Sequence, residues 1–210
     1  SAVPALKNQI TETEQLLNDN AFHIASTLCG SSGWPNNTYG YGRLDIKAAV
    51  DAALAQYAVS LAPSLVEQHG APGQTVSATL FITNTGTATN SFTVTLTGAH
   101  WPTIAPEKIG PLSAGDVATL PVTVTIPATA LGGATDAVTV TVISAGAPTQ
   151  NAQAMLRTMI DAVYGVQLWP PEIISNGDEG KTVVYTLALT NTGNITDVYS
   201  LTLSRATWPT

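Results

Sequence analysis

An internal repeat constrains the fold of this chain more than any other sequence feature. Residues 59–103 align without a gap with residues 166–210 at an offset of 107, and 20 of the 45 aligned pairs are identical. Two short motifs recur in full: Asn84-Thr85-Gly86 as Asn191-Thr192-Gly193, and Trp101-Pro102-Thr103 as Trp208-Pro209-Thr210. Self-similarity at a fixed period indicates a repeated structural unit. We therefore expect one complete module at 59–165 and the first half of a second copy at 166–210.

Apolar and polar residues alternate along the complete module, as they do in strands with one buried face. Four such runs are Val76 to Ile82, Phe92 to Leu96, Leu120 to Ile126 and Val138 to Val142, and a last strand is expected within Ala152 to Ala162. Turn sequences at 84–86, 113–116 and 131–134 separate the runs. About seven short strands in about 100 residues predict an immunoglobulin-like β-sandwich, without the Cys…Trp…Cys pattern of antibody domains.

Residues 1–57 have a helical pattern instead. Thr11 and Glu14 have the spacing of a capping box, which predicts a short helix that ends near Asn20. A second helix is expected after Asp45, a good N-cap residue. Its apolar face would be Ile46, Ala49, Val50, Ala53, Leu54 and Tyr57. A loop rich in Gly, Asn and Pro, residues 29–42, joins the two helices.

The loop and second helix, from Pro35 to Val50, resemble the C-terminal end of the subtilisin-like (S8) protease domain. In that family a Tyr-Gly-x-Gly-x-hydrophobic-Asp/Asn motif leads into a last, Ala-rich helix, and the matching residues here are Tyr39, Gly40, Gly42 and Asp45. The two glycines permit positive φ or a close backbone approach, and Asp45 caps the helix. The Pro4–Asn20 stretch also resembles the segment that follows the helix bearing the nucleophile, which would place Ser1 just after that helix.

The resemblance implies a parent that is a secreted serine endopeptidase acting on protein substrates. Such enzymes need Ser, His and Asp in a hydrogen-bonded series. The family's serine lies in a Gly-Thr-Ser-Met-Ala-x-Pro-His segment, which this sequence lacks, and no Asp or His motif of the triad occurs here. We therefore expect the chain to be inactive alone, with no catalytic, cofactor-binding or metal-binding residues. Residues 1–57 would be the tail of the protease domain, and the β modules would serve as spacer, stability or substrate-positioning units.

Composition excludes several other functions. The net charge is −7 and seven Lys and Arg are scattered over 210 residues, which disfavours nucleic acid and anionic membrane surfaces. No apolar run approaches the roughly 18 residues of a membrane span. Abundant Thr, Ser, Gly, Ala and Val with few Lys are typical of exported bacterial proteins, so a secreted or cell-surface location is expected.

The histidines, the single cysteine and the acidic residues are not expected to form a catalytic or metal site. His23, His69 and His100 are expected to be surface or structural histidines, with His23 solvated or capping the first helix. The lone Cys29 is either inert, paired with a cysteine elsewhere in the full protein, or a reactive thiol. The nearest approach to an acidic cluster is Asn176, Asp178 and Glu179, too few oxygens for calcium.

Tryptophans supply the main alternative function. Trp101 and Trp208, with Trp34 and Trp169, would suit sugar stacking in a surface adhesion or polysaccharide-binding protein built of immunoglobulin-like repeats. The structural alternative, which we favour, is that a Trp before Pro closes one end of each sandwich.

Open sheet edges in the half module and unpartnered helices predict self-association, by strand pairing, strand swapping or helix packing. The alternative is that residues 1–57 fold back onto the first sandwich.

Overall fold

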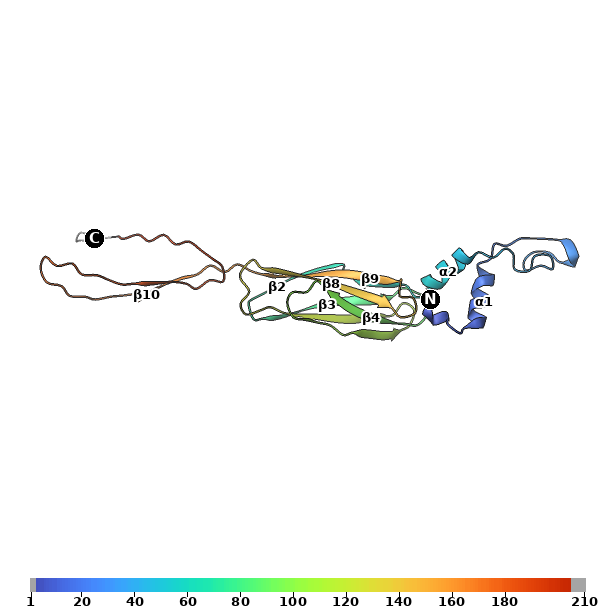
Figure 1. The fold of residues 1–210 in the computed structure, drawn as a ribbon, viewed down its shortest axis with the longest axis horizontal. Helices are drawn as coiled ribbons and strands as arrows, with labels where there is room; N and C mark the ends of the chain where they lie inside the picture. The colour runs from blue at the N-terminus through green and yellow to red at the C-terminus, as the bar shows by residue number, and fades with distance from the viewer. Residues whose placement is uncertain (1–2, 205–210) are drawn as a thin grey trace.

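The computed structural model describes residues 3–204 of the chain. It is elongated, with a helical segment at one end, a β-sandwich in the middle and a long hairpin at the other end (Figure 1). The fold is mainly β, as the sequence predicted. The second Trp-Pro-Thr motif, with Trp208, lies outside the described residues.

Nine strands build the sandwich, in two sheets. One sheet has the order β1-β3-β7-β5, with β1 Val59–Ala62, β3 Thr75–Asn84, β7 Val117–Thr125 and β5 Thr103–Ile104. The other has the order β2-β9-β8-β4-β6, with β2 Leu65–Gly70, β9 Asn151–Ile160, β8 Thr135–Ser144, β4 Asn90–Thr97 and β6 Lys108–Leu112. All neighbours are antiparallel except β2 and β9, which run parallel. This is an immunoglobulin-like arrangement.

The core lies between the two sheets and consists of the alternating residues found in the sequence. The largest fully buried side chains include Leu80, Ile82, Phe92, Leu120, Val122, Val124, Val138, Val140, Val142 and Leu156. Their polar neighbours in the chain point outward, as the period of two requires. The predicted strands and the turns at 84–86, 113–116 and 131–134 are therefore confirmed.

Residues 166–204 contain counterparts of two strands of the first module. β10 Val166–Trp169 pairs with β11 Ala188–Asn191, and these strands correspond to β1 and β3 at the repeat offset of 107. In the first module β2 is paired by β9, and β4 by β6 and β8. Residues 166–204 contain no counterpart of β6, β8 or β9, and most of their large apolar side chains are exposed.

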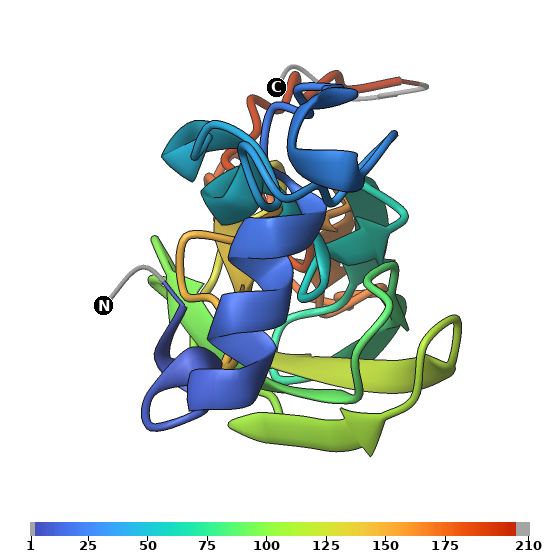
Figure 2. The ribbon, with the colours of Figure 1, turned by 90° about the vertical axis from the view of Figure 1, so that its right-hand side faces the viewer.

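Two α-helices and two 3-10 turns form the N-terminal segment: η1 Pro4–Leu6, α1 Ile10–Asp19, η2 Leu28–Gly30 and α2 Ile46–Ala55. α1 packs against α2 (Figure 2). The end of α1 agrees with the prediction, but its expected N-cap was wrong. Helical hydrogen bonding begins at Gln9, whose carbonyl oxygen accepts from Thr13 N at 3.1 Å and from Thr13 Oγ1 at 2.6 Å. Thr11 therefore lies inside the first turn, and the capping box does not form.

The helical segment touches the sandwich only at its near end and projects away from it (Figure 1). Val3 is buried there, Ala5 N donates to Gly146 O at 3.5 Å, and Tyr57 packs on Gly146 so closely that a Cβ at Gly146 would meet the ring at 2.2 Å. The alternative in which residues 1–57 fold back onto the sandwich is therefore not what the structure shows.

Candidate functional site

The loop that precedes α2 is organised by Asn36, a side chain that is 6% exposed. Its Oδ1 accepts from Thr38 N at 3.1 Å and from Tyr39 N at 2.8 Å, while its Nδ2 donates to Ile24 O and Gly33 O. The backbones of Asn36 and Gly40 exchange two further hydrogen bonds. Residues 36–40 therefore form a closed turn around one buried amide.

Gly42 allows the next part of the motif to pass close to another backbone segment. Its φ is 112°, and a Cβ there would lie 2.2 Å from Phe22 O. On either side of this approach, Phe22 N donates to Arg43 O at 2.7 Å and Arg43 N to Phe22 O at 2.9 Å. Gly40 also has positive φ, at 58°. Both glycines of the sequence motif therefore take backbone conformations that L side chains rarely adopt.

Asp45 completes the motif by capping α2. Its Oδ1 accepts from Ala48 N at 2.9 Å, which satisfies one of the free N–H groups of the first turn. A salt bridge joins Lys47, in the first turn of α2, to Asp51 and raises the pKa of the Lys47 ammonium, through the hydrogen bond to Asp51 and its charge. Both side chains of this pair are exposed, so its contribution to stability is small.

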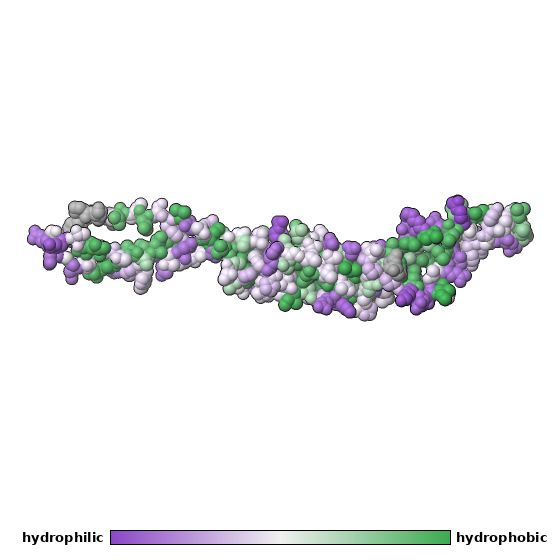
Figure 3. Space-filling model, in the orientation of Figure 1, coloured by the Kyte–Doolittle hydropathy of each residue, from purple (hydrophilic) through white to green (hydrophobic). Residues whose placement is uncertain are grey.

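The N-terminal helical segment, from α1 to α2, presents a large apolar surface. α2 buries only Ala49 and Ala53, whereas Ile46 of its apolar face is 62% exposed and Ile10 of α1 is 81% exposed. Other large side chains exposed on this segment are Phe22, Leu28, Tyr39, Tyr41, Leu44 and Val50. Figure 3 shows apolar residues gathered at this end of the molecule.

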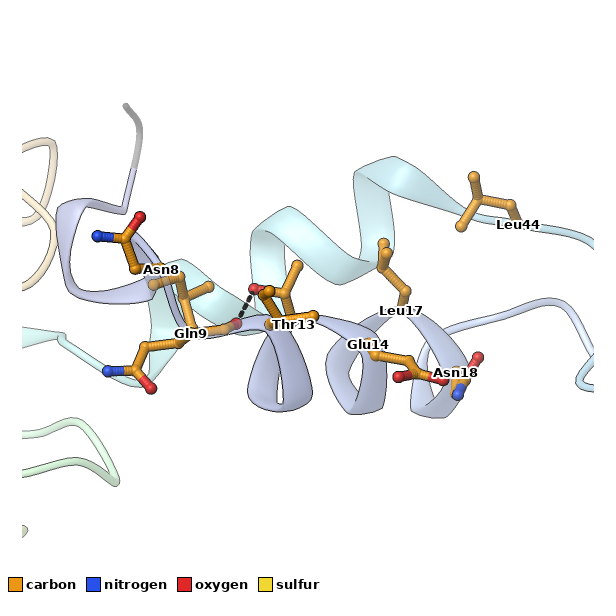
Figure 4. Close-up of a pocket in the computed structure, with 9 residues that line it drawn as sticks. Asn8, Gln9, Thr13, Glu14, Leu17, Asn18 and Leu44 are labelled. Atoms are coloured by element: carbon orange, nitrogen blue, oxygen red, sulfur yellow. Dashed lines mark hydrogen bonds between the residues drawn. The ribbon is translucent and has the colours of Figure 1, made fainter.

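An open groove of about 490 Å³ runs along α1 within this surface. Leu6, Ile10, Leu17 and Leu44 supply its apolar lining. Figure 4 shows Leu17 on the side of α1 that faces α2, and Leu44 in the segment that leads into α2; Glu14 and Asn18 of α1 also line the groove. Exposed groups of this kind are typical of a surface that is buried in a larger assembly.

Three aromatic rings meet at the base of the 23–41 loop. His23 stacks on Trp34 with ring centroids 3.5 Å apart, and Tyr41 meets the Trp34 ring edge-on at 5.7 Å. Trp34 Nε1 donates to Tyr41 O. One face of the Trp34 ring is therefore occupied by His23, which remains exposed to solvent and does not cap α1.

The other histidines lie in the sandwich module. His69 Nδ1 is 2.7 Å from Asp161 Oδ1, and His100 Nδ1 is 3.2 Å from Asp136 Oδ1. Asp136 is 3% exposed and also accepts from the backbone N–H groups of His100 and Trp101. The carboxylate therefore holds the corner at Trp101, which packs against the hydrophobic core.

The remaining candidates do not form a chemical site within residues 3–204. Cys29 is exposed, with φ of 55° and no disulfide partner in the described chain. Over the same residues, no three His, Cys, Asp or Glu side chains lie close enough to hold a metal ion, and this includes Asp178 and Glu179. None of the helices described is long and apolar enough to cross a membrane. Trp169 is exposed on the hairpin.

Comparisons with known proteins show the fold alone. No family model matches the sequence, and no curated protein matches it. Among solved structures, the PapD-like domain 7 of human CEP192 matches 52% of this chain and 87% of its own, with 13% identity and a TM-score of 0.37. The secreted serine protease VesC from Vibrio cholerae matches at 16% identity and a TM-score of 0.37, over 51% of this chain and 24% of its own. The VesB protease of the same organism matches at 16% identity and a TM-score of 0.31, over 56% of this chain and 36% of its own.

Two residues with a structural role were not found from the sequence. Asn36 stood inside the recognised motif, but its polar side chain gave no sign of burial. Asp136 is the second residue of β8 and one of the scattered acids of the sequence, and only the fold brings His100 and Trp101 to it.

Proposed function

We propose that residues 1–57 are the last part of a subtilisin-like serine protease domain and that the β modules are its spacer. The observation that carries this proposal is a preformed turn and helix that leave their apolar surface uncovered. The Asn36 turn, the Gly42 approach and the Asp45 cap fix the backbone, while Ile46, Val50 and the groove along α1 remain open.

The free energy that would be gained by burying these exposed apolar side chains supports the presence of a packing partner. Burial of apolar surface contributes about 25 cal/mol per Å², or about 1.5–3 kcal/mol for a Val, Leu, Ile or Phe side chain. Eight large apolar or aromatic side chains of residues 10–50 are exposed. Covering them with the rest of a protease domain would stabilise both parts.

By this proposal the catalytic Ser, His and Asp belong to the region encoded before this chain, and the chain itself supplies no catalytic residue. The parent hydrolyses peptide bonds by serine attack on the carbonyl. It is secreted by a bacterium, and the β modules act as a spacer that extends from the protease domain.

The test uses the natural protein that contains this chain, with casein as substrate. We expect cleavage that a serine-directed fluorophosphonate abolishes, and no cleavage by residues 1–210 alone. Gly42→Ala should remove most of the activity, because its Cβ would collide with Phe22 O. Gly33→Ala is the matched control: it has φ of 84° in the same loop, but no atom within 4 Å of the added Cβ. A natural protein without fluorophosphonate-sensitive activity would overturn the proposal.

Two of the four tryptophans give a polysaccharide-binding role little support, because Trp101 packs against the core and His23 covers one face of Trp34. Trp169 is exposed on the hairpin, and Trp208 lies outside the described residues.

We also propose that the chain self-associates through the β10–β11 hairpin. In the first module β3 is paired by β1 on one side and by β7 on the other, whereas β11 is paired only by β10 among the described residues. Leu189 is exposed, while its counterpart Ile82 is fully buried. A second copy would supply a partner for the open edge and cover part of the apolar face.

A further inference from the structure

The joint between the two modules consists of residues 161–165, which pass from the end of β9 to the start of β10. Short linkers without contacts leave neighbouring domains free to move. The polar groups of this linker are instead held by the 191–194 turn of the second module. Asn194 N donates to Val163 O at 3.0 Å, and Thr192 N donates to Gly165 O at 2.9 Å.

The side chain of Asn194 adds two bonds that bracket the linker. Its Oδ1 accepts from Val163 N at 2.8 Å, and its Nδ2 donates to Asp161 O at 2.9 Å. Both ends of one amide are therefore bonded to backbone groups two residues apart. An amide held in this way fixes the direction in which the chain leaves the first module.

Asn194 also reaches across to the first module. Gly132 N, in the turn before β8, donates to Asn194 O at 2.8 Å. The approach is so close that a Cβ at Gly132 would lie 2.4 Å from Asn194 Oδ1 and 2.9 Å from Ala162 Cα. The same turn is attached to β9, because Gly133 N donates to Ile160 O. Asn194 thus connects the turn before β8, the end of β9 and the second module.

The corresponding joint at the start of the first module lacks this side chain. There Thr85 N donates to Ala58 O at 3.1 Å, which matches the bond from Thr192 N to Gly165 O. The counterpart of Val163 O is Gln56 O, and it accepts instead from Ala88 N at 3.0 Å, one residue further along the chain than the position of Asn194. The counterpart of Asn194 at the repeat offset is Thr87. The bond from the threonine N–H of the turn is therefore common to both copies, and the Asn194 bonds are particular to the module–module joint.

We infer that Asn194 is the positioning residue that locks the second module at a fixed angle to the first. The two modules would then keep one relative orientation rather than move independently about the linker. This inference goes beyond the proposed function and holds whether or not the chain belongs to a protease.

The test is a spin-label distance measurement between the two modules. Thr95→Cys and Thr186→Cys place labels at exposed positions of β4 and of the hairpin, in a Cys29→Ser background, with excess unlabelled chain to suppress intermolecular distances. We expect one narrow distance distribution. Asn194→Ala should widen it at least twofold, and so should Gly132→Ala, which enters the joint from the other side.

Asn176→Ala is the control, because it replaces an exposed asparagine of the hairpin outside the joint and should leave the distribution narrow. The melting temperature of the first module should remain unchanged in Asn194→Ala, which separates loss of the lock from loss of the fold. A broad distance distribution in the chain without the Asn194 substitution would overturn the inference. So would an Asn194→Ala distribution as narrow as that of the unsubstituted chain.

Discussion

Val166 of β10 lies opposite Asn191 of β11, in the register that joins Val59 to Asn84 in the first module. The hydrogen bonds around the two asparagines recur as well. Asn84 Nδ2 donates to Ala88 O and Asn191 Nδ2 to Ile195 O, both at 2.8 Å. The sequence repeat is therefore a structural repeat down to single hydrogen bonds, in the residues that both copies contain.

Asn84→Ala should destabilise the first module. The side chain is fully buried and bonds Ala88 O, Leu112 O and Gly86 N, so the substitution leaves buried backbone groups without partners. We expect the free energy of unfolding to fall by about 3 kcal/mol, measured by urea denaturation. Asn191→Ala, the same change at the exposed copy, should leave the midpoint of this transition in place.

Asp45→Ala should weaken α2. It removes the acceptor of Ala48 N, and loss of an N-cap costs about 1 kcal/mol. Far-ultraviolet circular dichroism should show lower helicity and earlier fraying on heating. Thr11→Ala is the comparison: the structure gives Thr11 no capping role, and an equal loss there would mean that the capping box exists after all.

Tyr199 should be a late-titrating tyrosine. Burial raises the pKa of its phenol, with the charge of Asp197 adding to the effect, and its hydroxyl donates to Gly165 O at 2.9 Å. A pKa raised in the folded state stabilises the contact below the ordinary value of about 10, and this stabilisation is lost as the pH rises through the folded value. Absorbance at 295 nm should show a high-pH component that Tyr199→Phe removes. A high-pH component that persists in Tyr199→Phe would contradict the assignment.

Leu189→Lys should reduce self-association. It places a charge on the apolar face of β11, where Ile82 is buried in the other copy. Sedimentation velocity at increasing concentration should show dimers or larger species for the unsubstituted 210-residue chain and mainly monomer for the variant. Gln167→Lys adds the same charge at an exposed position whose neighbours Val166 and Leu168 point to the other face, and should have little effect. An unsubstituted chain that stays monomeric at high concentration would contradict the proposal.

Local patterns in the sequence predicted the features that local physics controls. The long strands β3, β4, β7, β8 and β9 follow from alternation, and α2 follows from Asp45 and the apolar spacing. The short edge strands β5 and β6 and the parallel pairing of β2 with β9 could not be predicted, because pairing with distant residues decides them. The Thr11 prediction failed since Gln9, a weak capping residue, begins the helix two residues earlier.

The candidate site was predicted at the level of backbone, not of side-chain environment. Gly40, Gly42 and Asp45 do what their residue types indicated. The burial of Asn36, the stack of His23 on Trp34 and the bonds of Asn194 depend on segments that meet only in the folded chain.

Hydrogen exchange over residues 44–57 tests the central claim most directly, when the natural protein is compared with the 210-residue chain. If a protease domain covers the apolar face of α2, amides around Ile46 and Val50 should exchange at least tenfold more slowly in the natural protein, with exchange in β3 and β8 unchanged. Equal exchange of residues 44–57 in the two proteins would contradict the account, because this surface would then have no partner in the parent molecule.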